Sequence, residues 1–183
     1  MHTTLPRRFY ADPEFYRAEL ERFYITRWIC AGRADQIPNA GDYFTRALGD
    51  DSVIVTRDGS GDIHALFNVC RHRGTRLCEQ ADGHFAGRIQ CPYHAWTYDL
   101  DGQLLAAPHM PPEFRKQDYP LHRADCETWD GHIFVRLGRQ GQDGRQRLTG
   151  RTGRCARSCA TCRTGLPRGG WATSGLAGAS SMT

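Results

Sequence analysis

The chain has 183 residues, of which 39% are hydrophobic and 24% charged, a composition that fits a folded domain and excludes collagen-like and coiled-coil classes. No apolar run approaches the roughly 20 residues of a membrane helix, and the N-terminus lacks the apolar stretch of a secretory signal, so the sequence predicts a soluble, cytoplasmic protein without membrane segments. Residues 1–138 hold 16 Lys+Arg and 19 Asp+Glu, whereas residues 139–183 hold 8 Arg and 1 Asp, so the basic charge belongs to a tail and does not indicate nucleic-acid binding.

The first predicted element is a helix over residues 13–26. Asp12 provides an N-cap, Pro13 occupies the first helical position and Glu14 suits the helix dipole. Apolar residues then recur at helical spacing, which predicts an amphipathic helix: Phe15, Tyr16, Leu20, Phe23 and Tyr24.

After this helix the pattern changes to short β-branched or aromatic runs separated by turn residues. This pattern predicts strands, and strands every 8–12 residues are typical of a small antiparallel β domain. The predicted strands cover residues 28–32, 43–47, 52–57, 63–69, 88–91, 97–100, 121–128 and 132–137.

The apolar pattern ends at Gly138. Residues 139–183 contain no Val, Ile, Phe or Tyr, and such a stretch buries too little apolar surface to offset the entropy of ordering it. The sequence therefore predicts an N-terminal arm and helix (1–27), a β domain (28–138) and a disordered tail (139–183). The fold class is all-β with an N-terminal helix.

Two short motifs carry the chemistry: Cys70-Arg71-His72 and Cys91-Pro92-Tyr93-His94. Each offers one thiolate and one imidazole after a predicted strand, which is the inventory of a [2Fe–2S] cluster with two cysteine and two histidine ligands. A Cys2His2 zinc site uses the same residue types but favours pairs of like ligands. The spacing thus favours a cluster formed by Cys70, His72, Cys91 and His94, with zinc and coincidence as alternatives.

The residues around these motifs resemble a known family. Asn68–Gly74, Cys91–Tyr98, Asp101-Gly102 and Ala107–Met110 are similar to the Rieske domain of ring-hydroxylating oxygenase α subunits. Within that family the similarity is strongest to the branch acting on glycine betaine, choline and carnitine. The resemblance covers about residues 5–137 and implies a Rieske-type antiparallel β fold.

The resemblance implies that Cys70 and Cys91 bind an inner iron and that His72 and His94 bind an outer iron nearer solvent. Imidazole ligands place such clusters between roughly −150 and +300 mV. High-potential Rieske proteins carry an extra disulfide over the cluster, and the comparable positions here are Thr75 and Tyr93. A potential in the lower, oxygenase-like range is therefore expected, as is electron transfer from a flavin- or ferredoxin-type reductase.

In full-length relatives the Rieske domain passes electrons to a mononuclear non-haem Fe(II), held by two histidines and a carboxylate, where a small organic substrate meets O2. Such relatives are often homotrimers. Residues 139–183 contain no histidine and read like a GC-rich gene translated out of frame. We therefore hypothesise a truncated or frameshifted oxidoreductase that does not hydroxylate alone. A stand-alone Rieske ferredoxin and a zinc-stabilised, non-redox module are the alternatives.

The remaining cysteines are predicted to be structural or accidental. Cys30 and Cys126 lie in predicted strands and are expected to be small buried apolar residues. The tail motif Cys155–Cys162 has the spacing of a radical SAM cluster, but too few residues follow it to build the surrounding barrel, so we interpret it as accidental.

Overall fold

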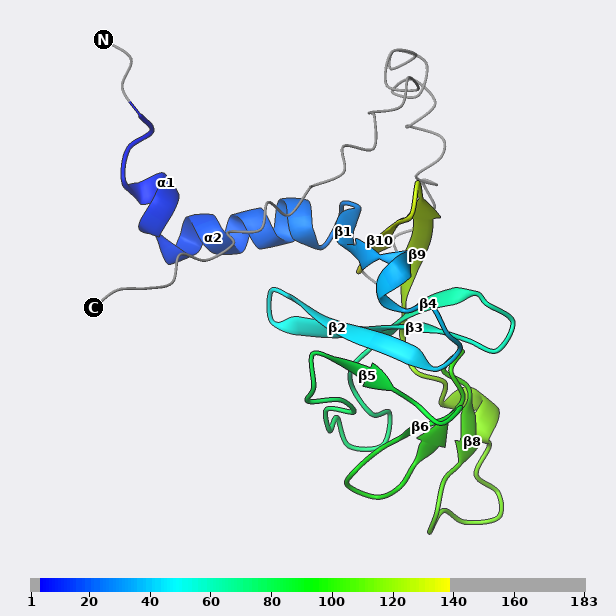
Figure 1. The fold of residues 1–183 in the computed structure, drawn as a ribbon. Coiled ribbons are helices and arrows are strands. Elements are labelled where there is room, and N and C mark those ends of the chain that lie inside the picture. Colours follow the sequence, from blue (N-terminus) through cyan, green and yellow to red (C-terminus); the bar gives the residue numbers. More distant parts are fainter. Residues whose placement is uncertain (1–3, 139–183) are drawn as a thin grey trace, which may run out of the picture. The chain divides into compact units, whose positions relative to one another are not determined.

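The computed structural model describes residues 4–138, drawn in colour in Figure 1. The predicted tail and its Cys155–Cys162 motif lie outside the described residues. The boundaries proposed at residues 27 and 138 stay a prediction.

The N-terminal region forms two short helices, α1 (Arg8–Ala11) and α2 (Pro13–Glu19), and α2 continues as a π-helical turn over Leu20–Tyr24. The Asp12 carboxylate accepts a hydrogen bond from the Glu14 backbone N–H at 2.9 Å, so the predicted N-cap is confirmed. No side chain of α1 or α2 is buried. Among residues 4–138, no helix is both long and apolar enough to span a bilayer.

Within residues 4–138, ten strands form two antiparallel sheets, which confirms the mostly β fold class. In Figure 1 the small sheet lies below β2 and β3, while β1, β9 and β10 lie above them. The small sheet has the order β6 (Ile89–Gln90), β7 (Thr97–Tyr98), β8 (Leu104–Ala106). The larger sheet has the order β1 (Ile29–Arg33), β10 (His132–Arg136), β9 (Arg123–Trp129), β4 (Ile63–Phe67), β3 (Asp51–Arg57), β2 (Asp42–Leu48), β5 (Asp82–His84). The described part of the chain also contains 3-10 turns at Ala34–Gln36 and Lys116–Asp118.

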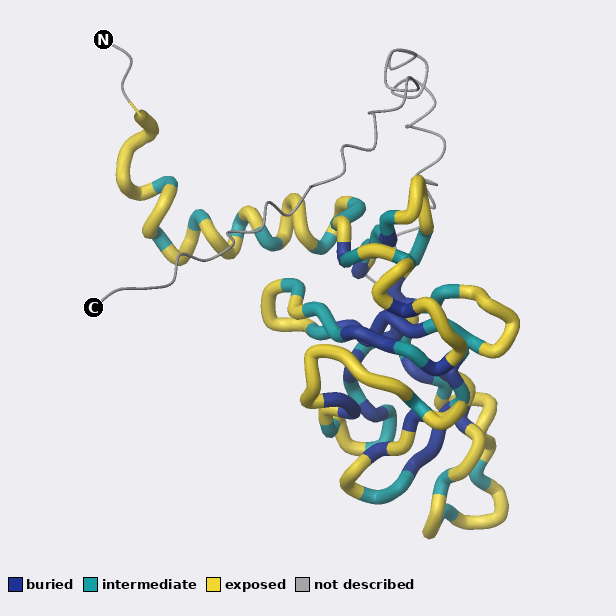
Figure 2. Tube along the Cα trace, in the orientation of Figure 1, coloured by how far each residue is buried: buried dark blue, intermediate teal, exposed yellow. Residues whose placement is uncertain are grey.

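The buried side chains form two separate apolar cores, one on each face of β3. Successive side chains of a strand point to opposite faces, so Ile54 enters one core while Val53 and Val55 enter the other. We call these the lower core and the upper core. The lower core contains Ile54, Leu66, Ile89, Trp96, Tyr98 and, in addition, Cys70, Cys78 and Cys91. The upper core contains Phe44, Val53, Val55, Ile133 and Val135. Figure 2 shows that the buried segments follow the strands and that the N-terminal helices are largely exposed.

All eight predicted strands occur, with ends shifted by a few residues. Two further strands, β5 and β8, were not predicted. β5 is an Asp-Gly-His segment that is exposed throughout and exists because its backbone pairs with β2. The prediction that Cys30 is buried was wrong, because β1 is an edge strand and Cys30 is exposed on it.

Candidate metal centre

The first ligand motif lies in a tight loop after β4. The Cys70 carbonyl accepts a hydrogen bond from the Gly74 N–H at 3.0 Å, and the Cys70 N–H donates to the Thr75 carbonyl at 2.8 Å. Gly74 has φ of 71°, a conformation that glycine adopts without steric cost. These bonds close the loop so that His72 lies at its centre.

The second motif, which links β6 to β7, forms a loop with the same closure. The Cys91 carbonyl accepts from the Ala95 N–H at 3.1 Å, and the Cys91 N–H donates to the Trp96 carbonyl at 2.8 Å. Ala95 occupies the position of Gly74, with φ of 56°. Two motifs 21 residues apart in the sequence therefore use one turn, in which the cysteine starts the loop and the histidine lies inside it.

A buried asparagine anchors the first loop. The Asn68 side-chain oxygen accepts hydrogen bonds from the Leu77 and Cys78 N–H groups at 3.0 and 2.8 Å, and its amide donates to the Cys78 carbonyl at 2.8 Å. Asn68 thus joins the end of β4 to the chain leaving the loop. This role was not predicted, since an asparagine before a cysteine carries no distinguishing spacing.

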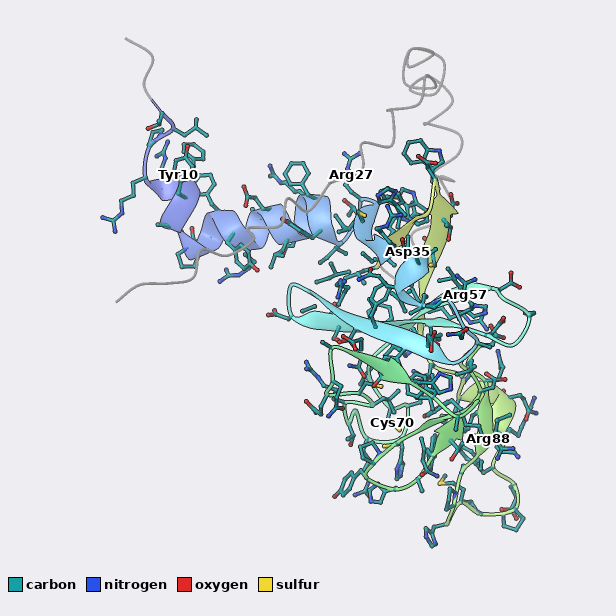
Figure 3. The ribbon with its side chains drawn as sticks, in the orientation of Figure 1. Tyr10, Arg27, Asp35, Arg57, Cys70 and Arg88 are labelled. Atoms are coloured by element: carbon teal, nitrogen blue, oxygen red, sulfur yellow. The ribbon has the colours of Figure 1, made fainter. Side chains whose placement is uncertain are left out.

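The two loops bring the four predicted ligands together, with sulfur inside and nitrogen outside. Cys70 and Cys91 are each 3% exposed, and their thiols interact directly. His72 and His94 are half-buried, and their ring centroids are 4.8 Å apart. Figure 3 shows Cys70 in the part of the molecule that holds β5, β6 and β8.

Tyr98 on β7 supports both the sulfur and the backbone of the first loop. Its hydroxyl lies 3.3 Å from the Cys70 Sγ and accepts a hydrogen bond from the Arg71 N–H at 3.2 Å. Burial, and next the hydrogen bond with Cys70, raise the pKa of Tyr98, so the phenol stays neutral and can donate to sulfur. Burial also raises the pKa of the Cys70 thiol, whereas hydrogen bonds from Tyr98 and from the His72 N–H lower it.

Trp96 forms a wall against the imidazole of His72. The two rings stack with centroids 4.8 Å apart and an angle of 9° between their planes. Burial, followed by the charges of His94 and Arg73, lowers the pKa of His72. Neutral imidazole is the form that binds a metal, so this environment suits a ligand.

These groups fit a two-iron cluster. Within residues 4–138, no three His, Cys, Asp or Glu side chains gather closely enough to hold one metal ion. Two thiolates and two imidazoles shared between two irons supply one pair of ligands to each iron. The Trp96 Nε1 is buried beside His72 and has no hydrogen-bond partner among the described residues, as expected of a wall that faces an additional polar group. The role of the four residues as ligands stays a prediction.

The chain is similar in sequence to known proteins. The glycine betaine monooxygenase oxygenase subunit of Chromohalobacter salexigens is 42% identical over 138 residues, which are 75% of this chain and 31% of that protein. Biphenyl 2,3-dioxygenase subunit alpha of Rhodococcus jostii is 40% identical over 139 residues, or 74% of this chain and 30% of that protein. The chain therefore spans about a third of the length of these curated relatives.

Solved structures show the same fold. The apo quaternary ammonium Rieske monooxygenase CntA matches with a TM-score of 0.72 and 28% identity, over 85% of this chain and 46% of that one. Naphthalene 1,2-dioxygenase from Rhodococcus sp. matches with a TM-score of 0.68 and 34% identity, over 72% and 31%. The sequence profile of the Rieske [2Fe-2S] domain matches residues 27–127, more than half of the chain. The chain belongs to the Rieske [2Fe–2S] domain family, as found in Rieske oxygenase α subunits.

Proposed function

We propose that this chain transfers single electrons through a Rieske [2Fe–2S] cluster bound by Cys70, His72, Cys91 and His94. One observation carries the proposal: two loops with identical backbone closure place two buried thiols and two half-buried imidazoles against each other. The arrangement supplies soft sulfur ligands inside and nitrogen ligands near solvent, as a mixed-ligand cluster requires.

When bound, the cluster accepts and releases one electron. The protein's part is to hold its potential and to control access. The burial of Cys70 and Cys91 keeps water from the thiolates, and the Tyr98 hydroxyl donates to one of them. His72 and His94 face the solvent side, so electron exchange with a partner is expected through the imidazoles.

The partners follow from the relatives, several of which are oxygenase α subunits. In the proposal a flavin- or ferredoxin-type reductase supplies the electron. In a full-length parent the electron passes to a mononuclear Fe(II), where O2 and a small organic substrate react. Similarity to glycine betaine monooxygenase subunits and to CntA supports a quaternary ammonium compound as that substrate. A homotrimer is the assembly that the family resemblance implies.

Absorption and electron paramagnetic resonance (EPR) spectra of the anaerobically purified chain test this function. We expect a Rieske signal after reduction and two irons per chain. Replacement of Cys70 or Cys91 by serine, or of His72 or His94 by alanine, should abolish the signal, because each change removes an iron ligand. A retained signal would remove that residue from the ligand set.

A matched control lies in the same loop. Cys78 is also buried, and burial raises its pKa to about 11, so it remains a thiol. Cys78→Ala should therefore keep the Rieske signal and the iron content. A colourless wild-type protein with stoichiometric zinc would refute the redox function altogether.

A further inference from the structure

Arg71, which lies between the ligands Cys70 and His72, differs from the other arginines of its loop. Arg73 and Arg76 are exposed, whereas Arg71 is half-buried. Its Nε is fully buried and has no hydrogen-bond partner among the described residues. A guanidinium group is always charged, and a buried charge without compensation is costly.

The guanidinium rests on an imidazole and not on a carboxylate. The Arg71 Nη1 contacts the Nε2 of His122, which precedes β9. Because arginine only donates hydrogen bonds, this Nε2 must be unprotonated. Burial, and next the charge of Arg71, lower the pKa of His122. The contact therefore holds the guanidinium in place and adds no negative charge.

No carboxylate among residues 4–138 forms an ion pair with Arg71. The turn that contains Asp101 is joined to the chain beside His122, since the Leu121 N–H donates to the Gly102 carbonyl at 2.7 Å. However, Asp101 is paired with Arg123 at 2.5 Å and faces the His64 Nδ1 at 3.4 Å. Among the described residues, the positive charge of Arg71, which follows Cys70 in the sequence, therefore has no carboxylate partner.

We infer that Arg71 is the fixed counter-charge of the reduced cluster, with His122 as its positioning residue; this inference rests on the proposed function. Two ferric ions, two sulfides, two thiolates and two neutral imidazoles carry no net charge, and one added electron leaves one negative charge. The backbone of Arg71 adjoins that charge, because the backbone N–H donates to the Tyr98 oxygen that lies 3.3 Å from the Cys70 Sγ. Its side chain carries the guanidinium from there to His122. Arg71 therefore favours the reduced state and raises the potential.

The expected size follows from Coulomb's law. A half-buried unit charge roughly 10 Å from the added electron changes the redox equilibrium about tenfold. For a one-electron couple, a tenfold change corresponds to about 59 mV. Loss of the Arg71 charge should lower the midpoint potential by this amount.

The test is a redox titration of the full 183-residue chain, loaded with its cluster and followed by EPR. Arg71→Gln should lower the midpoint potential by about 59 mV, which corresponds to a tenfold change in the equilibrium constant for reduction. Arg71→Lys should recover most of this loss. Arg76→Gln is the matched control, because it removes an exposed charge from the same loop and should change little.

A second pair of variants, at His122, changes the compensation of the Arg71 charge and leaves the sequence of the ligand loop unchanged. His122→Glu places a carboxylate against Arg71 and should lower the potential as Arg71→Gln does, whereas neutral His122→Gln should not. If Arg71→Gln fails to bind the cluster, this pair decides. Equal potentials in the two His122 variants, or in Arg71→Gln and Arg76→Gln, would overturn the inference. A wild-type chain without a Rieske signal would instead refute the proposed function.

Discussion

Tyr98 shows how one hydroxyl can serve two purposes at the ligand loops. Its oxygen accepts from the Arg71 N–H, and it also lies 3.3 Å from the Cys70 sulfur, to which it would donate when Cys70 is a thiolate. A donor to a ligating sulfur withdraws electron density from it, which stabilises the reduced cluster and raises the potential. The hydroxyl is held in the lower core, where Tyr98 is fully buried.

Tyr98→Phe should therefore lower the midpoint potential. A lost hydrogen bond of roughly 1.5 kcal/mol to a charged group corresponds to about a tenfold change in the equilibrium constant for reduction. Tyr43→Phe is the control, since the hydroxyl of Tyr43 contacts Cys78, which is not a predicted ligand. Both potentials can be measured by protein-film voltammetry. Equal potentials in the two variants would show that the Tyr98 hydroxyl does not tune the cluster.

Asp58, in the turn between β3 and β4, is the most strongly hydrogen-bonded carboxylate of the described residues. Burial alone would raise its pKa, but bonds from His64, Ser60 and the Asp62 N–H outweigh this effect and hold the pKa well below its usual value. The Asp58 Oδ2 lies 2.7 Å from the His64 Nε2, and Oδ1 accepts from both the N–H and the hydroxyl of Ser60.

Because the folded-state pKa of Asp58 is depressed, its stabilisation is complete at neutral pH. This stabilisation declines as the pH falls below the pKa of Asp in the unfolded chain, about 4, and it is lost as the pH falls through the pKa of Asp58 in the folded chain. Asp58→Asn should cost about 2 kcal/mol at pH 7 and should flatten the loss of stability between pH 5 and pH 3. Urea unfolding at both ends of this range measures the effect. Asp50→Asn, at an exposed turn, is the control and should change the free energy of unfolding at pH 7 little.

At the scale of elements, the two ligand loops share one backbone turn but differ in the residue at its left-handed position. Gly74 has φ of 71° and Ala95 has φ of 56°. A non-glycine residue in this region costs roughly 1 kcal/mol. The second loop therefore carries backbone strain that the first loop avoids.

Exchanging these two residue types should change stability in opposite directions. Gly74→Ala should destabilise the chain by about 1 kcal/mol through backbone strain alone, because a Cβ there meets no atom within 4 Å. Ala95→Gly should be neutral or stabilising by up to about 1 kcal/mol. Chemical denaturation of the cluster-loaded proteins provides both values. A destabilisation of similar size in both variants would contradict a shared turn geometry.

The elements also show what the sequence could and could not predict. The run Val53-Ile54-Val55 predicted β3 because buried strands are rich in β-branched residues, and the cysteine–histidine spacing predicted which residues the loops bring together. β5 was not predicted because it forms through backbone pairing with β2, which leaves no apolar pattern in its own residues. The roles of Asn68, Tyr98 and Trp96 depend on contacts across 9 to 28 residues of sequence, which no local pattern contains.

At the scale of the whole described unit, the division into two cores places the predicted cysteine ligands on one side of β3. Cys70 and Cys91 belong to the lower core, together with Ile54 and Trp96, whereas the upper core contains no predicted ligand. Metal binding contributes directly to folding where ligands complete a core. The lower core is therefore the part that should depend on the cluster.

Removal of the cluster by a chelator should consequently loosen the molecule unevenly. We expect amide hydrogen exchange to accelerate in β6, β7 and the ligand loops, while β9 and β10 keep their protection, because local stability follows local packing. Mass spectrometry of the cluster-loaded and cluster-free chains measures this. A uniform gain in exchange across both cores would show that the unit unfolds as one.

The placement of both thiols inside an apolar core also has a consequence for the life of the protein in the cell. Since both thiols belong to the lower core, where the proposed cluster would join them, we expect the two loops to reach their final packing only when iron and sulfide are supplied. We expect chains made under iron starvation to keep the ligand loops open to proteases. The rate at which the protein is degraded would then depend on the iron supply of the cell.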